Sequence, residues 1–61
     1  MTYYYQLRTF KLTVKDGWIS TFDSFDTLTE LQQHIEHIEK FVPIGVPECL
    51  YRTFEIRRIY T

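Results

Sequence analysis

A single amphipathic helix, predicted over residues 25–42, constrains the fold of this chain more than any other feature. Thr27 and Glu30 form a capping box near its start, and Pro43 ends it because the residue before a proline resists helical geometry. Apolar side chains recur at spacings of three and four residues, which places them on one side of the helix: Leu28, Leu31, Ile35, Ile38 and Val42. One helix can cover only one face of a small sheet, so the other face meets solvent or a partner.

Aromatic and threonine residues dominate the segments on both sides of this helix. The chain has five Tyr, five Phe and one Trp, and such side chains fit the pleated surface of a sheet. We expect strands in a hairpin before the helix and in residues 50–60 after a loop over residues 43–48. That loop is long enough for the last strand to lie beside the first. The predicted fold is therefore α+β, a β-β-α-β chain whose three-stranded antiparallel sheet has the order 2-1-3, with one helix on one face.

The hairpin over residues 10–22 turns at Lys15-Asp16-Gly17. A two-residue loop would mix polar and apolar side chains on each face. A three-residue loop with Gly17 in the left-handed conformation pairs Val14 with Trp18 and separates the two kinds of side chain, and we prefer it. In this register one face, expected to be the core, carries the large apolar side chains of Phe10, Leu12, Val14, Trp18 and Phe22.

The first residues of the chain are out of phase with this hairpin. Tyr3, Tyr5 and Leu7 have odd numbers, whereas the apolar residues that follow have even numbers. A bulge near Arg8 and Thr9 would bring all of them to one face. Without a bulge, the three side chains lie opposite the core as an exposed aromatic strip. The sequence leaves both arrangements open, and with them whether Tyr3 and Tyr5 are core or surface residues.

Length and composition restrict the function. A chain of 61 residues is one domain, residues 1–61, and at this size it buries only about 60% of its unfolded surface. Cys49 lies beside Glu48, which disfavours a reactive thiolate, and the sequence has neither a nucleophile elbow nor a glycine-rich phosphate loop. His34 and His37 lie three residues apart rather than at the four-residue spacing of a zinc helix. We expect no enzymatic activity, no cofactor and no metal.

Charge is distributed unevenly along the chain, although the net charge is only −1. Residues 1–15 carry three basic and no acidic side chains, and residues 49–61 carry three basic and one acidic. The middle, residues 16–48, carries seven acidic side chains and one basic. If the two basic ends form adjacent strands, the molecule has a basic sheet and an acidic helix. Since no long apolar run or signal-peptide pattern is present, we expect a cytoplasmic protein without membrane contact.

These features predict a binding protein. The open sheet face is expected to carry Ile19 and Lys11 together with the outward side chains of the last strand, and such an apolar and basic surface favours a partner. The candidate partner-binding residues on the sheet are Arg52, Arg57, Arg58, Tyr51, Ile59 and Lys11. The alternative is the acidic helix, where the candidates are Asp26, Glu30, His34, Glu36, His37 and Glu39.

The partner class has a favoured hypothesis and two alternatives. We favour a protein partner, with this chain acting as an inhibitor or adaptor. The first alternative is a single-stranded nucleic acid stacked on tyrosines of a basic sheet. The isoelectric point near 6.0 and the absence of an RNP-type motif argue against it. The second alternative is a homodimer formed through the open sheet face.

Three short runs occur in the order helix start, turn and strand: residues 27–31 (TLTEL), 42–45 (VPIG) and 54–59 (FEIRRI). Together they resemble the helix–loop–strand half of the small phage proteins that inhibit bacterial RNA polymerase. The match covers about half the chain and departs from the family in its aromatic hairpin and in a longer stretch before the last strand. The resemblance implies a phage-encoded protein that disables a host factor in the host cytoplasm, with Arg57 and Arg58 on the strand that meets the target.

Overall fold

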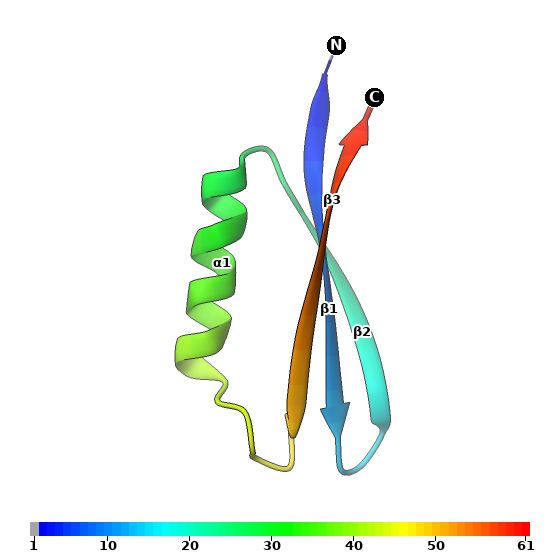
Figure 1. The fold of residues 1–61 in the computed structure, drawn as a ribbon, viewed down its shortest axis with the longest axis vertical. Helices are drawn as coiled ribbons and strands as arrows, with labels where there is room; N and C mark the ends of the chain where they lie inside the picture. Colours follow the sequence, from blue (N-terminus) through cyan, green and yellow to red (C-terminus); the bar gives the residue numbers. More distant parts are fainter. Residues whose placement is uncertain (1) are drawn as a thin grey trace.

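Three strands and one helix make up the fold in the computed structural model, which describes residues 2–61. Their order is β1 (Tyr3–Thr13), β2 (Gly17–Phe25), α1 (Leu28–Phe41) and β3 (Tyr51–Tyr60). The strands form an antiparallel sheet of order β2-β1-β3, and α1 lies along one face of it (Figure 1). The predicted α+β class and strand order are confirmed.

The helix begins where its capping residues place it. Thr27 is the N-cap in extended conformation, and its hydroxyl accepts a hydrogen bond from the backbone N–H of Glu30 at 3.2 Å. The helix starts three residues later than predicted because Phe25 still pairs with Tyr5 in the sheet. It ends at Phe41, just before the proline. Within residues 2–61, no helix combines the length and apolarity needed to cross a bilayer.

The face of the sheet that α1 covers carries Leu7, which is fully buried, as is Leu31 of the helix. His34 of the helix approaches Asp23 at 3.5 Å and the ring of Phe25 at 5.1 Å, so these β2 residues point toward α1. Leu7 lies opposite Asp23 in the ladder and therefore shares this orientation. We call this side the covered face; it consists of the odd-numbered residues of β1 and β2 and the even-numbered residues of β3.

The predicted core face is wrong. Phe10 and Trp18 share one face as expected, but that face points away from α1, and Trp18 is 55% exposed. β1 pairs without a bulge from Tyr3 to Thr13, so Leu7 and Phe10 stay on opposite faces. On the covered face Leu7 and Thr9 are buried, whereas Trp18 and Phe22 on the other face are more than half exposed.

The hairpin turn has the predicted length of three residues but begins one residue earlier. Thr13 faces Gly17 across the hairpin. The Thr13 hydroxyl accepts a hydrogen bond from the Asp16 backbone N–H at 2.9 Å and closes the turn. Gly17 has φ 70°, the left-handed conformation predicted for it, which a residue with a Cβ adopts less readily.

Val14 does not pair with β2, because it bonds instead to the loop that precedes β3. Its backbone N–H donates to the Pro47 carbonyl at 3.0 Å. Leu12 therefore faces Trp18, where the predicted register paired Leu12 with Ser20. This shift moves the pairing by two residues, and because side chains alternate with a period of two, it leaves the face of each residue unchanged.

The contrast between two leucines of α1 tests the position of the core. Replacing the fully buried Leu31 by alanine is expected to lower the free energy of unfolding by about 2–5 kcal/mol, because it leaves a cavity. Leu28 is 40% exposed, so Leu28→Ala should cost clearly less. Urea denaturation followed by circular dichroism measures both. Equal losses at the two positions would contradict the burial of Leu31 between the helix and the sheet.

Candidate functional site

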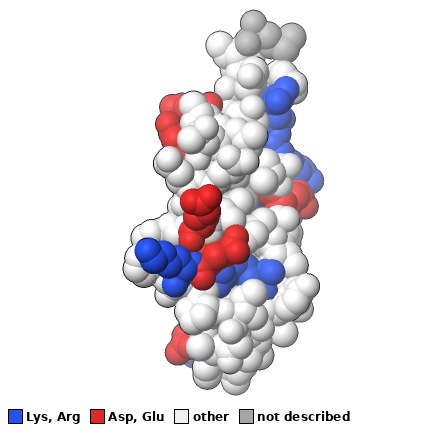
Figure 2. Space-filling view, turned by 60° about the vertical axis from the view of Figure 1, so that its left-hand side comes forward, with Lys and Arg blue, Asp and Glu red and all other residues white. Residues whose placement is uncertain are grey.

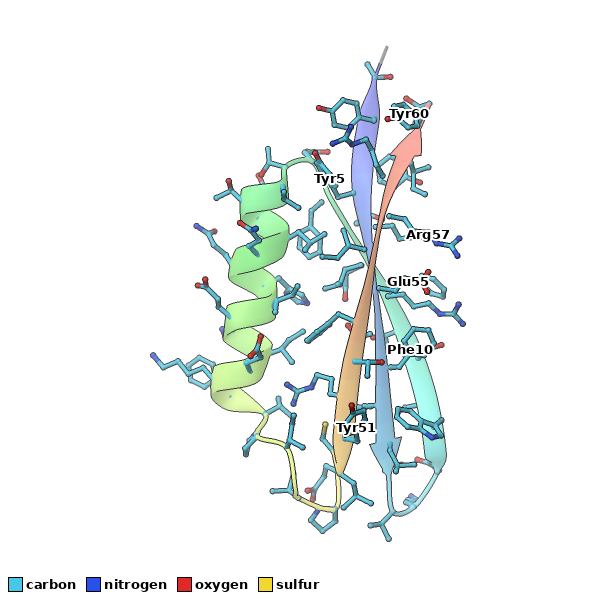
Figure 3. All side chains as sticks on the ribbon, viewed as in Figure 1. Tyr5, Phe10, Tyr51, Glu55, Arg57 and Tyr60 are labelled. Carbon is cyan, nitrogen blue, oxygen red and sulfur yellow. The ribbon has the colours of Figure 1, made fainter. Side chains whose placement is uncertain are left out.

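The uncovered side of the sheet, which we call the open face, consists of the even-numbered residues of β1 and β2 and the odd-numbered residues of β3. Because β1 is central and both neighbours are antiparallel, these residues form rows across the strands. Phe10, Glu55 and Arg57 extend on the side of the sheet away from α1 (Figure 3). Five of its fourteen residues are aromatic, and two are arginines.

The row nearest the hairpin turn joins the two edge strands. Trp18 of β2 and Tyr51 of β3 both flank Leu12 of β1 in the ladder. Their rings meet edge-to-face, with centroids 6.0 Å apart and planes at 82°. Both side chains remain more than half exposed. A preformed aromatic pair therefore lies at this end of the open face.

Arg8 occupies the middle of β1 and of the open face. Its guanidinium carbon lies 4.5 Å from the ring centroid of Phe10 and 5.0 Å from that of Phe22, the residue directly opposite on β2. Two cation–π contacts hold the side chain between these rings. The Nε atom of Arg8 is buried without a hydrogen-bond partner among the described residues. The centre of the open face is thus a positive group flanked by two aromatic rings, with Glu55 on the neighbouring strand.

An exposed ion pair lies beside Arg8 on β3. The Nε of Arg57 donates to an oxygen of the Glu55 carboxylate at 2.7 Å. Glu55 is also the residue opposite Arg8 on the neighbouring strand. The carboxylate nearest to Arg8 along the ladder is therefore engaged with Arg57.

A second aromatic cluster lies on the other side of the sheet, where β1 and β3 extend beyond the first turn of α1 (Figure 1). Arg58 stacks over the rings of Tyr3 and Tyr5, at 4.8 and 5.6 Å from their centroids. Its guanidinium also donates to the hydroxyls of Tyr60 and Tyr5, and these hydrogen bonds raise the pKa of Arg58 above its usual value. Tyr3 and Tyr5 are thus neither core residues nor part of the open face.

The sheet residues predicted to bind a partner do not all lie together. Tyr51, Arg57 and Ile59 share the open face as expected, whereas Arg58 points to the opposite side. The placement of Lys11 on the open face is wrong, and so is that of its ladder partner Ile19. Both belong to the covered side and line an open hollow of about 420 Å³ near the hairpin turn, together with Thr13, Val14, Lys15, Asp16, Pro47 and Glu48.

Arg52 is not a surface residue, in contrast to its prediction as a partner-binding residue. It is only 8% exposed, and its guanidinium donates to the backbone carbonyl of Val42 at the end of α1. The same guanidinium nitrogen lies 3.5 Å from the sulfur of Cys49, which is fully buried. Arg52 therefore ties β3 to the C-terminal end of the helix, where a cation is favoured.

The helix presents the acidic surface that the charge pattern predicts, as the red groups over the helix side show (Figure 2). Four of the six candidates on this surface are exposed carboxylates: Asp26, Glu30, Glu36 and Glu39. His34 turns instead toward Asp23 of the sheet, and exposed His37 stacks on Phe41 with centroids 4.5 Å apart. Among the described residues, no three His, Cys, Asp or Glu side chains gather as a metal site would require.

The sequence interpretation missed Arg8, Phe10, Trp18 and Phe22 as surface residues. Arg8 was considered only as one of the basic residues of the first segment and as the place of a bulge, and the three aromatic residues were assigned to the core. The even numbering of Arg8 and Phe10 could have revealed a shared face, because a charged residue in phase with aromatic ones indicates exposure of all of them. Comparison with protein-family models, curated proteins and solved structures finds no match to this chain.

Replacing Arg52 separates its structural contacts from a role in binding. Arg52→Gln is expected to lower the free energy of unfolding by about 1–3 kcal/mol, because the Val42 carbonyl loses its charged donor. Arg58→Gln is the matched control on the same strand and should leave stability little changed, since Arg58 is exposed. Thermal or urea denaturation measures the difference. If Arg52→Gln is as stable as the unmodified protein, the contact with Val42 does not stabilise the fold, and Arg52 is again a candidate for partner binding.

Proposed function

We propose that this protein is a non-catalytic binding protein that docks another protein on its open face. The observation that carries this proposal is the exposure of large aromatic side chains on one side of the sheet. Trp18, Phe22 and Tyr51 are 55%, 56% and 53% exposed and lie on the same face. Monomeric proteins seldom leave a contiguous surface of this kind without a partner.

The composition of the open face suits a protein interface. Trp, Tyr and Arg are the residues that most often dominate binding energy, because they combine large apolar area with a polar group. Each aromatic side chain can bury about 150–250 Å². The strand pairing on both sides of β1 fixes the backbone that carries these side chains, so docking requires no ordering of the backbone there.

The resemblance to phage inhibitors of bacterial RNA polymerase suggests the first partner to test. In that proposal the chain is phage-encoded, acts in the host cytoplasm and disables the polymerase by binding it. Arg57 lies on the open face and fits the role that the resemblance implies, whereas Arg58 lies on the other face within the tyrosine cluster. If the partner binds on the open face, Arg57 can contact it and Arg58 cannot.

A single-stranded nucleic acid remains the second candidate, and one observation favours it. Aromatic rings and two arginines, Arg8 and Arg57, share a sheet face, which is how bases are stacked and phosphates neutralised in sheet-based RNA-binding domains. Glu55 on the same face opposes it by repelling phosphates. A homodimer through the open face is the third candidate.

Substitutions on the open face test the proposed function. Trp18→Ser and Phe22→Ser are each expected to weaken binding to purified bacterial RNA polymerase by about tenfold or more, because each removes an aromatic anchor. The half-exposed positions of both side chains predict that the variants still fold. Isothermal titration calorimetry measures the affinity, and circular dichroism checks the fold. Glu36→Gln and Glu39→Gln on the helix are the matched controls and should bind as the unmodified protein does.

Other outcomes identify the other candidates. Loss of binding in the helix controls alone would assign the interface to the acidic surface of α1. A salt-dependent mobility shift with single-stranded DNA or RNA, abolished by Trp18→Ser, would favour the nucleic-acid alternative. Concentration-dependent dimerisation in sedimentation, abolished by the same change, would favour the homodimer.

A further inference from the structure

We propose that Arg8 receives a carboxylate side chain of the partner protein, so that the open face recognises an acidic residue flanked by apolar ones. This inference rests on the proposed function and specifies the chemistry of its partner. It assigns the central anchor of the interface to β1, on residues that neither the charge pattern nor the predicted sheet surface singled out.

Arg8 is held in place before any partner arrives. Phe10, two residues along the same strand, and Phe22, directly opposite on β2, place their rings 4.5 and 5.0 Å from its guanidinium carbon. A long side chain that is already ordered loses less freedom on binding than a mobile one. The planar guanidinium matches the geometry of a carboxylate, which can accept two parallel hydrogen bonds from it.

Arg8 also lacks an acidic partner within the described part of the chain. Glu55 lies opposite it on β3, yet the Glu55 carboxylate binds Arg57 at 2.7 Å, and no carboxylate of residues 2–61 forms an ion pair with Arg8. The Nε of Arg8 is buried and has no hydrogen-bond partner among residues 2–61. The terminal nitrogens of this guanidinium are not enclosed in the same way, and they are the donors that a carboxylate of a partner can reach.

The charge of the open face fits a carboxylate better than a polynucleotide. The face carries Arg8 and Arg57 against Glu55, and the Glu55–Arg57 pair leaves one free positive charge. A nucleic-acid backbone brings a phosphate with every nucleotide and is bound by a row of cations. One cation flanked by two aromatic rings instead suits one acidic side chain with apolar neighbours, from which water is excluded on docking.

The same position disfavours a second copy of the chain as the occupant. Arg8 lies near the middle of β1, and β1 is the central strand of the sheet. Face-to-face packing about a two-fold axis through this centre would bring the Arg8 side chains of two copies toward each other. Burying two like charges without counter-charges is strongly unfavourable. A partner that supplies the carboxylate removes this cost.

The test uses random 12-residue peptides displayed on phage and selected on the immobilised protein. The strongest peptides are synthesised with a fluorescent label, each also in a form with its Asp and Glu replaced by Asn and Gln. Affinities are measured by fluorescence anisotropy against the unmodified protein, Arg8→Gln, Arg8→Lys, Arg58→Gln and Trp18→Ser. Circular dichroism of each variant confirms that it is folded. A labelled 12-nucleotide oligo(dT) is titrated in parallel.

We expect the selected peptides to contain Asp or Glu next to aromatic or aliphatic residues. Neutralising that residue and replacing Arg8 by glutamine should each weaken binding by about 10- to 100-fold, as loss of a charged hydrogen bond does. The two changes together should cost little more than either alone, because they remove the same contact. Arg8→Lys should show an intermediate loss. Arg58→Gln, the control on the opposite face of the sheet, should show a loss of less than about threefold.

The results separate two kinds of failure. Peptides that lose affinity in Trp18→Ser but lack acidic residues, or bind Arg8→Gln as well as the unmodified protein, overturn the role of Arg8 and leave the proposed function standing. Tighter binding of oligo(dT) than of any peptide, with dependence on Trp18, overturns the carboxylate in favour of phosphate. Selection of no peptide, or only of peptides indifferent to Trp18 and Arg8, overturns the docking function of the open face as well.

Discussion

The packing of α1 on one face of the sheet is the contact on which the rest of this structure depends. Leu31 of the helix and Leu7 of the central strand are both fully buried, and few other side chains are. Arg52 adds a polar connection by joining β3 to the carbonyl of Val42 at the end of the helix. In a chain of 61 residues without a disulfide, this small interior supplies most of the apolar burial available.

The position of the helix determines which side chains are left for binding. Because α1 occupies the side of Leu7, the aromatic rows of the hairpin and the Trp18–Tyr51 pair face away from it. Arg8, in the middle of the central strand, lies at the centre of that surface. The acidic helix and the open face therefore lie on opposite sides of the molecule, and each presents a different chemistry to a partner.

Local patterns predicted the elements and their order well. Thr27 and Glu30 specify the start of the helix, Gly17 the turn, and the long loop after α1 the position of β3 beside β1. The side of the sheet that becomes the core was predicted wrongly, because the larger aromatic residues were taken to be the buried ones. Arg52 and Lys11 were misplaced for a related reason, since their positions depend on how the helix and the loop before β3 lie against the sheet.

The sequence by itself determined which residues share a face within an uninterrupted strand or helix, because side chains alternate along a strand and recur along a helix with fixed periods. That β1 runs without a bulge was decided by the tertiary structure. The sequence also determined the charge of each segment and the absence of a disulfide framework. Only the tertiary structure decided which face the helix covers and what surrounds Arg8. Both sides of the sheet carry large apolar and aromatic residues, so alternation along the strands cannot choose between them. The choice follows from the long-range packing of Leu31 of the helix on the side of Leu7.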